Sequence, residues 1–336
     1  MKFKFLTLLL VLCIVCEYVS WKIIQSKLLK RIHVLHPKLT MVTSYKICHK
    51  KLDENGNTGN QLFEISAAYC TSLKNSNYLK FYLPNSCQKL PIFNWFSNLN
   101  KFLIPDILPT KEIYEMDFYS EINIPLDGGI YAIRGMRQDW RYVIDYQTEL
   151  KQLFDIKLDI QLPDKFIALH VRRGDYLKLQ YHFAKCSNQY YQNALQIIYA
   201  QDPTSINYPI IICSNDRDYA LQLASLLSPL AVVSNINNNS MMDFYTMMKA
   251  QHLIIANSTF SFWAAFLSQQ ENSIVVSPSE YGNQKDFRTM LIRNRSIVLQ
   301  HWYTLHPNTG EIAIPSDALG CFPFLNTARC YYMLRH

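Results

Sequence analysis

One stretch decides the fold of this 336-residue chain: Phe166-Ile167-Ala168-Leu169-His170-Val171-Arg172-Arg173-Gly174-Asp175-Tyr176. Its apolar start predicts a buried strand of a parallel sheet, and Gly174 then allows a sharp turn. Ligands of open α/β sheets bind beyond the carboxyl ends of the strands, and the fork of an arginine suits phosphate oxygens. The stretch therefore predicts a diphosphate site, although an Arg-Asp pair that closes a surface turn beside a buried His170 fits the same residues.

Apolar strands alternate with helices through the second half of the chain. We expect strands at residues 166–171, 209–213, 230–233, 253–256 and 273–276, with helices at 188–200, 217–227, 241–251 and 262–269. This alternation predicts a doubly wound parallel sheet. The first half is more mixed, with a helix expected at 59–73, a strand at 78–83 and an irregular aromatic-rich segment at 90–126. We therefore expect two α/β halves with a cleft between them.

A second strand end has a different chemistry. The segment Asn257-Ser258-Thr259-Phe260-Ser261 links the strand expected at 253–256 to an apolar helix. Hydroxyl residues at this place cap a helix, and the free amides of its first turn form a natural phosphate site. An ordinary cap without a ligand fits the same residues.

These motifs carry a resemblance. The chain is similar to the alpha-1,2-fucosyltransferases of glycosyltransferase family 11 in the motifs His170–Tyr176, Asn257–Trp263, Gly59-Asn60-Gln61-Leu62-Phe63 and Gly135–Trp140, and in the segment 243–250. They occur in the family's order over residues 50–300. Three departures stand out: Gly56-Asn57-Thr58 before the Gly59 motif, Thr259 in place of serine, and Phe262 in place of tryptophan. The resemblance implies a GT-B-like fold of two Rossmann-like halves, an acceptor-side half at 42–160 and a GDP-fucose-binding half at 161–300, followed by a C-terminal segment at 301–336.

The resemblance also implies an activity. It is the inverting transfer of L-fucose from GDP-fucose to the 2-hydroxyl of a terminal β-galactoside on a glycan, with no metal or other cofactor. Arg172 would neutralise the leaving diphosphate. Asp175 is the other expected catalytic residue, although Glu64 and Asp139 also qualify as the base. Further donor contacts are expected from His170, Arg173, Asp243, Asn257, Ser258, Thr259 and Phe260. The acceptor side of the cleft is expected to include Gly59, Asn60 and Gln61.

Other functions fit parts of the sequence. A fucosyltransferase of different linkage or acceptor would share the same motifs. Asp216 and Asp218 have the Asp-x-Asp spacing of a metal-dependent nucleotide-sugar transferase, but a helix begins directly after them, which favours a capping role. Arg173-Gly174-Asp175 spells an adhesion tripeptide, so a secreted adhesion protein is the non-enzyme alternative.

The N-terminus predicts entry into the secretory pathway. Lys2 and Lys4 precede an apolar run from Phe5 to Cys16, which is shorter than the roughly 20 residues of a comfortable membrane span. A cleaved signal peptide and a retained anchor both fit this run. The resemblance implies a type II Golgi anchor at 5–21, after a cytoplasmic tail at 1–4 and before a stem at 22–41, with a lumenal catalytic domain.

Charge and cysteine content agree with a lumenal glycosyltransferase. The net charge of +7 favours anionic partners, and the absence of a long basic run interleaved with aromatic residues disfavours nucleic acid. An odd number of cysteines beyond the apolar run leaves at least one thiol without an intramolecular partner. Cys321–Cys330 is the first expected disulfide, and Cys213 is expected to be a buried thiol. We expect glycosylation at Asn238 and Asn294 but not at Asn257, which falls in the donor site.

Overall fold

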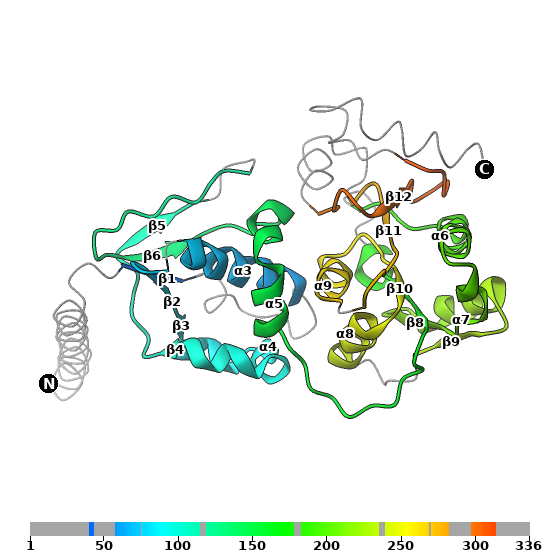
Figure 1. Ribbon diagram of the computed structural model, residues 1–336, viewed down its shortest axis with the longest axis horizontal. Helices are drawn as coiled ribbons and strands as arrows, with labels where there is room; N and C mark the ends of the chain where they lie inside the picture. The colour runs from blue at the N-terminus through cyan, green and yellow to red at the C-terminus, as the bar shows by residue number, and fades with distance from the viewer. Residues whose placement is uncertain are drawn as a thin grey trace, which may run out of the picture.

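The computed structural model describes residues 40–43, 58–74, 76–114, 119–177, 183–234, 239–268, 270–281 and 297–313. These residues form two α/β halves that lie side by side, each built on a parallel sheet (Figure 1). The predicted α/β class with parallel sheets is therefore confirmed. The predicted anchor, Asn238, Asn294 and the Cys321–Cys330 pair lie outside the described residues. Within those residues no helix is long and apolar enough to span a bilayer.

The first half contains a four-stranded sheet in the order β2-β1-β6-β5, with all strands parallel. Its strands are β1 (Thr40–Thr43), β2 (Leu79–Phe81), β5 (Lys111–Ile113) and β6 (Ile130–Ile133). The helices are α3 (Thr58–Lys74), α4 (Pro91–Trp95) and α5 (Gln147–Leu153), and β3 (Leu83–Pro84) pairs with β4 (Leu103–Ile104). The helix predicted at 59–73 is confirmed as α3. The segment predicted as irregular at 90–126 is wrong in part, because it contains α4, β4 and β5.

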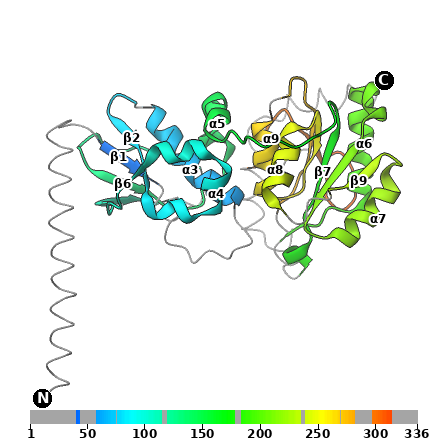
Figure 2. The ribbon, with the colours of Figure 1, turned by 90° about the horizontal axis from the view of Figure 1, so that it is seen from below.

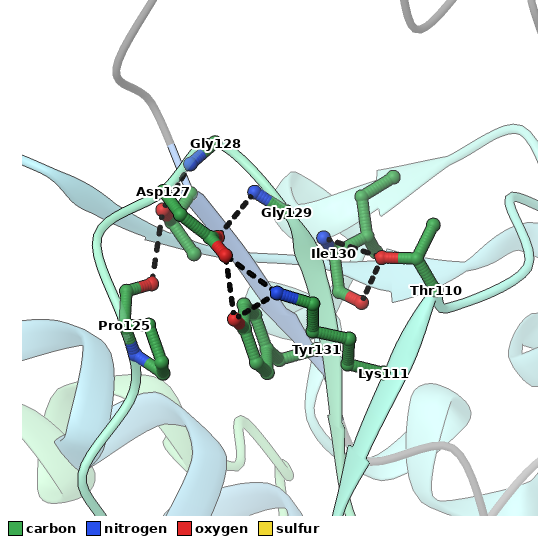
Figure 3. Close-up of polar contacts among 9 residues, drawn as sticks. Thr110, Lys111, Pro125, Asp127, Gly128, Gly129, Ile130 and Tyr131 are labelled. Atoms are coloured by element: carbon green, nitrogen blue, oxygen red, sulfur yellow. Dashed lines mark hydrogen bonds and ion pairs between the residues drawn. The ribbon is translucent and has the colours of Figure 1, made fainter.

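A polar turn closes the amino-terminal edge of this sheet. Asp127 accepts a hydrogen bond from the backbone amide of Gly129 at 2.9 Å, and its carboxylate also binds Lys111 and the hydroxyl of Tyr131 (Figure 3). Thr40 ties β1 to the same turn through the amide of Gly128. The cluster fixes the start of β6 at the edge of the sheet opposite to the strands' carboxyl ends.

The second half contains a six-stranded parallel sheet in the order β12-β11-β10-β7-β8-β9. Its strands are β7 (Ile167–Val171), β8 (Ile210–Ser214), β9 (Ala231–Val233), β10 (His252–Ile254), β11 (Val275–Pro278) and β12 (Tyr303–Leu305), and its helices are α6 (Asn188–Gln201), α7 (Arg217–Leu227), α8 (Ser240–Lys249) and α9 (Thr259–Leu267). The chain winds outward from β7 to β9 and then returns to place β10 on the other side of β7. This reversal is the switch point at which doubly wound sheets bind ligands.

Prediction and structure agree closely in this half. All five predicted strands and four predicted helices are present, with ends that differ by a few residues. The largest difference is at α9, which begins at Thr259 rather than at 262, because Ser258 already caps it. Strand β12 was not predicted and extends the sheet beyond residue 300. Cys213 is a buried free thiol, as predicted.

The two halves share one apolar core. Helices α3 and α5 of the first half face α9 of the second half in the middle of the molecule (Figures 1 and 2). Phe63 of α3 packs against the rings of Phe262 and Trp263, with ring centroids 5.0 Å apart in both pairs. Gln147 of α5 donates to the backbone carbonyl of Phe266 at 2.7 Å. This packing fixes how the N-termini of α3 and α9 meet.

Candidate active site

The two strand ends singled out in the sequence come together at the switch point. Strands β7 and β10 are neighbours, with Leu169 paired to Ile254. Beyond their carboxyl ends, the hydroxyl of Tyr176 donates to the backbone carbonyl of Asn257 at 3.1 Å. The rings of His170 and Phe260 lie with centroids 5.6 Å apart. The cationic motif and the hydroxyl-rich motif therefore form one site.

The Gly59 motif of the first half reaches the same place. A Cβ on Gly59 would lie 2.4 Å from the carbonyl carbon of Thr259 and 2.5 Å from the amide nitrogen of Phe260, so only glycine allows this approach. The side-chain carbonyl of Asn60 accepts from Thr259 at 2.9 Å and from Gln138 at 2.7 Å. The N-termini of α3 and α9 consequently converge, and each carries roughly half a positive charge.

The two adjacent arginines have different surroundings. The guanidinium of Arg172 lies 5.3 Å from the ring centroid of Tyr176, the residue that binds the backbone of the second motif. The guanidinium of Arg173 instead forms an ion pair with Asp216 at 3.1 Å and lies 3.9 Å from the ring centroid of Tyr219. Arg173 is thus held against α7. The predicted donor contacts of Arg172 and Arg173 both stay predictions.

His170 is buried and neutral. Its side chain is 6% exposed, and burial, followed by the nearby charge of Arg172, lowers the pKa of its imidazole to about 3. Its Nδ1 has no hydrogen-bond partner among the described residues. A buried ring nitrogen without a partner is costly, so a bound ligand that offers a donor or acceptor here would lower that cost.

Several polar groups at the start of α9 already form hydrogen bonds within the protein. Asn257 is 2% exposed and donates to the carbonyls of Ala184 and Tyr281, a burial that agrees with an unmodified side chain. The hydroxyl of Ser258 accepts from the amide of Phe260 at 3.3 Å, and the Ser258 amide donates to a carbonyl at 2.7 Å. Two amides at this helix start, those of Ser258 and Phe260, are therefore already engaged within the protein. The N-terminus of α9 as a whole still carries a partial positive charge that can attract an anion.

The three candidate bases differ in their burial and in their hydrogen-bond partners. Asp139 is bound by the guanidinium and the backbone amide of Arg141 and is 4% exposed, so its carboxylate is already engaged. Glu64 is buried in α3 with 3% exposure. The side chain of Asp175 lies outside the described residues, so its role as the base stays a prediction.

The other acidic candidates have structural partners. Asp216 caps α7 by accepting from the amide of Tyr219 at 3.2 Å, which confirms its predicted capping role. Asp243 accepts from the hydroxyl of Ser234 at 3.0 Å, and burial raises the pKa of its carboxyl to about 6. In the part of the chain that the structure describes, no group of three or more metal-ligating side chains could hold an ion.

Two of the departures from the family motif have different consequences. Phe262 is fully buried and packs on Phe63, so this substitution changes the core rather than the site. Thr259 touches the site through its bond to Asn60. Sequence reasoning gave no role to Tyr176 or to Gln138, although both stand inside the motifs that carry the resemblance.

Comparison with known proteins agrees with this site. The sequence model of glycosyltransferase family 11 matches residues 131–306, more than half of the chain. The chain belongs to glycosyltransferase family 11. It is therefore a glycosyltransferase, and the resemblance seen in the sequence is confirmed.

Three relatives illustrate the family. The O-antigen biosynthesis glycosyltransferase WbnK of Escherichia coli is 27% identical over 82% of this chain and 93% of its own length. An alpha-1,2-colitosyltransferase of Escherichia coli is 26% identical over 70% of this chain and 92% of its own. A galactoside 2-alpha-L-fucosyltransferase of Bos taurus is 21% identical over 77% and 74%. Among solved structures, a mutant of Arabidopsis thaliana FUT1 in complex with GDP covers 71% of this chain and 70% of its own, with 10% identity and a TM-score of 0.40.

Proposed function

We propose that this family 11 glycosyltransferase transfers L-fucose from GDP-fucose to the 2-hydroxyl of a terminal β-galactoside, with inversion at the anomeric carbon. Two relatives support the linkage, since one is a galactoside 2-alpha-L-fucosyltransferase and the other an alpha-1,2-colitosyltransferase. The O-antigen relative suggests a bacterial-type polysaccharide as a second class of acceptor beside protein- or lipid-linked glycans.

One observation carries the proposal: two helix N-termini meet beside Arg172 at the switch point. Gly59 brings the start of α3 into contact with Thr259 and Phe260 at the start of α9. Two positive helix ends repel each other when nothing lies between them, and an anion relieves this repulsion. A nucleoside diphosphate supplies such an anion, so the arrangement favours a GDP-linked donor.

The chemistry follows from how charge develops during transfer. Negative charge grows on the β-phosphate as the bond between fucose and the diphosphate breaks. We infer that the fork of Arg172 and the two helix ends stabilise that charge, which would be electrostatic preorganisation. The 2-hydroxyl of the acceptor attacks the anomeric carbon from the opposite face and loses its proton to a base, for which Asp175 is our candidate.

The remaining roles stay predictions. In a GT-B-like arrangement the halves would hold donor and acceptor between them, with Asp243 at the guanine edge and Asn60 and Gln61 nearer the sugars. Gln61 is buried, and its side-chain carbonyl has no partner among the described residues. The membrane anchor, the Golgi location and the glycosylated asparagines depend on residues outside the described ranges.

The alternatives lose support at specific contacts. Asp216, which a metal-dependent transferase would need, is occupied by the cap of α7 and by Arg173. The adhesion tripeptide requires a free Arg173, and the same ion pair holds its side chain. The colitosyltransferase relative suggests one alternative that is closer to the proposed function. In this alternative the donor carries L-fucose without its 3-hydroxyl.

A donor and acceptor panel tests the proposal. Purified protein is incubated with GDP-fucose, its 3-deoxy analogue, GDP-mannose and UDP-galactose, each with a β-galactoside, and the product linkage is determined by NMR. We expect an α-1,2-linked fucoside, and GDP alone should raise the melting temperature because it binds the folded state. Transfer from another donor, or to another hydroxyl, would overturn the proposed donor or linkage.

A further inference from the structure

A cavity of about 640 Å³ opens at the amino-terminal edge of the second sheet. Its lining includes the first residues of β10 and β11 and the turn that follows α6. The candidate active site lies at the opposite, carboxyl edge of the same sheet, so the two are distinct. The volume falls within the roughly 300–1,000 Å³ that is usual for small-molecule sites.

The floor of this cavity is held rigidly. His252 is 1% exposed, and its Nδ1 accepts from the backbone amide of Ile274 at 3.1 Å. With that nitrogen occupied as an acceptor, Nε2 carries the proton and donates to Asp202 at 3.0 Å. The ring of Tyr208 lies nearly parallel to the imidazole, at an interplanar angle of 15°. A site fixed by such contacts needs little reorganisation to bind a ligand.

The rim offers both donors and acceptors. Lys165, Glu271 and Asn272 are exposed around the opening, and Tyr208 and Tyr303 are partly exposed. Ser273 also lines the cavity, and its hydroxyl is buried without a hydrogen-bond partner among the described residues. A buried hydroxyl without a partner is unfavourable, and Ser273 adds to the polar character of the lining.

The chemistry of the lining selects a class of ligand. The charges are mixed, with the ammonium of Lys165 opposed by the carboxylates of Asp202 and Glu271, so a strongly anionic ligand is disfavoured. The lining is mainly polar, which disfavours an acyl chain. A neutral molecule with many hydroxyls and apolar ring faces suits the donors, the acceptors and the two tyrosines together. We propose that this cavity is a second carbohydrate-binding site, one that holds part of the acceptor glycan away from the reacting sugar.

This role gives a characteristic kinetic signature. A glycan long enough to reach both edges would be bound at two places, and its apparent affinity would rise with chain length. The reacting galactose would not sense the cavity, so turnover at saturation would be unchanged. That the bound glycan is the acceptor rests on the proposed function. That the cavity binds a carbohydrate does not rest on it.

Saturation-transfer NMR on the full chain tests the proposal with a galactose-terminated hexasaccharide and with lactose as probes. The variants are Lys165→Ala and Asn272→Gly; Asn272 has a φ of 57°, which glycine adopts freely. The exposed Lys101→Ala in the first half serves as the control. We expect the inner sugars of the hexasaccharide to lose saturation in both cavity variants, with KM for the hexasaccharide raised about 5-fold or more and KM for lactose unchanged.

The outcomes separate this site from the proposed function. Equal saturation in the cavity variants and in the control would overturn the second site, even if fucose transfer is observed. Conversely, binding that depends on Asn272, in a protein that transfers no fucose, would support the site and refute the proposed function.

Discussion

Replacing Gly59 with alanine should strongly lower turnover, because the added Cβ displaces the start of α9. The new Cβ would lie 2.4 Å from Thr259 and 2.5 Å from Phe260, both backbone atoms, whereas ordinary contacts begin near 3.4 Å. The start of α9 must therefore move by about 1 Å. The same shift along the bond from Thr259 to Asn60 stretches it from 2.9 Å to about 3.9 Å, beyond hydrogen-bonding range.

The expected cost follows from these distances. A misplacement of about 1 Å in a site can lower turnover by about 100-fold, and overpacking lowers the free energy of unfolding by about 1–3 kcal/mol. The assays are kcat/KM for fucose transfer and urea denaturation. Gly129→Ala is the matched control, because the atoms nearest to its new Cβ belong to the side chains of Asp127 and Tyr131, at the far edge of the first sheet (Figure 3). Near-normal transfer by Gly59→Ala, or an equal loss in the control, would refute the reasoning.

Three further changes follow from the site. Thr259→Val removes the hydroxyl that binds Asn60 and should lower kcat/KM by about 5- to 13-fold, as expected for one lost hydrogen bond of about 1–1.5 kcal/mol. Thr259→Ser should stay near wild type in the same transfer assay. Asp216→Asn keeps a capping oxygen but loses the ion pair with Arg173. Urea denaturation should therefore show that the free energy of unfolding falls by at most about 1 kcal/mol, with near-normal turnover. Loss of all turnover would instead support a role for Asp216 in binding a metal. His170 has a pKa of about 3 in the folded state, below its unfolded value of 6.5. Its contribution to the free energy of unfolding is therefore complete above pH 6.5. This contribution falls as the pH drops toward 3, by at most about 1.4 kcal/mol per pH unit. The free energy of unfolding of His170→Gln should therefore vary less between pH 7 and 5 than that of wild type, and equal slopes would show that His170 titrates normally.

The second half could be predicted well because its signals are local. Each strand from β7 to β11 is a short, mostly apolar run. Each helix begins at a capping side chain such as Asp216 or Ser258. Strand alternation with helices then leaves few topologies, and the switch point follows from them.

The first half was less predictable because its pairing is not local. Strands β1 and β5 are defined by their pairing with β6, which lies far away in the sequence. The sequence also did not predict the contacts between the two halves. Nothing near Asn60 indicates that its partners are Gln138 and Thr259, since these contacts arise only when α3 packs against α9.

The same limit applies to the paired arginines. Adjacent residues with identical side chains gave no basis for separating their roles, and the structure separates them because only Arg173 meets Asp216 and Tyr219. We propose that Arg172, rather than a metal ion, stabilises the leaving diphosphate.

The most direct test is steady-state fucose transfer in excess EDTA by wild type, Arg172→Lys and Arg173→Lys. Our account predicts that wild type stays active without divalent ions. Arg172→Lys should lose about 100-fold or more in kcat although it keeps its charge, because the two-pronged contact is lost, and Arg173→Lys should lose far less. Near-normal transfer by Arg172→Lys, or wild-type activity that vanishes in EDTA and returns with manganese, would contradict it.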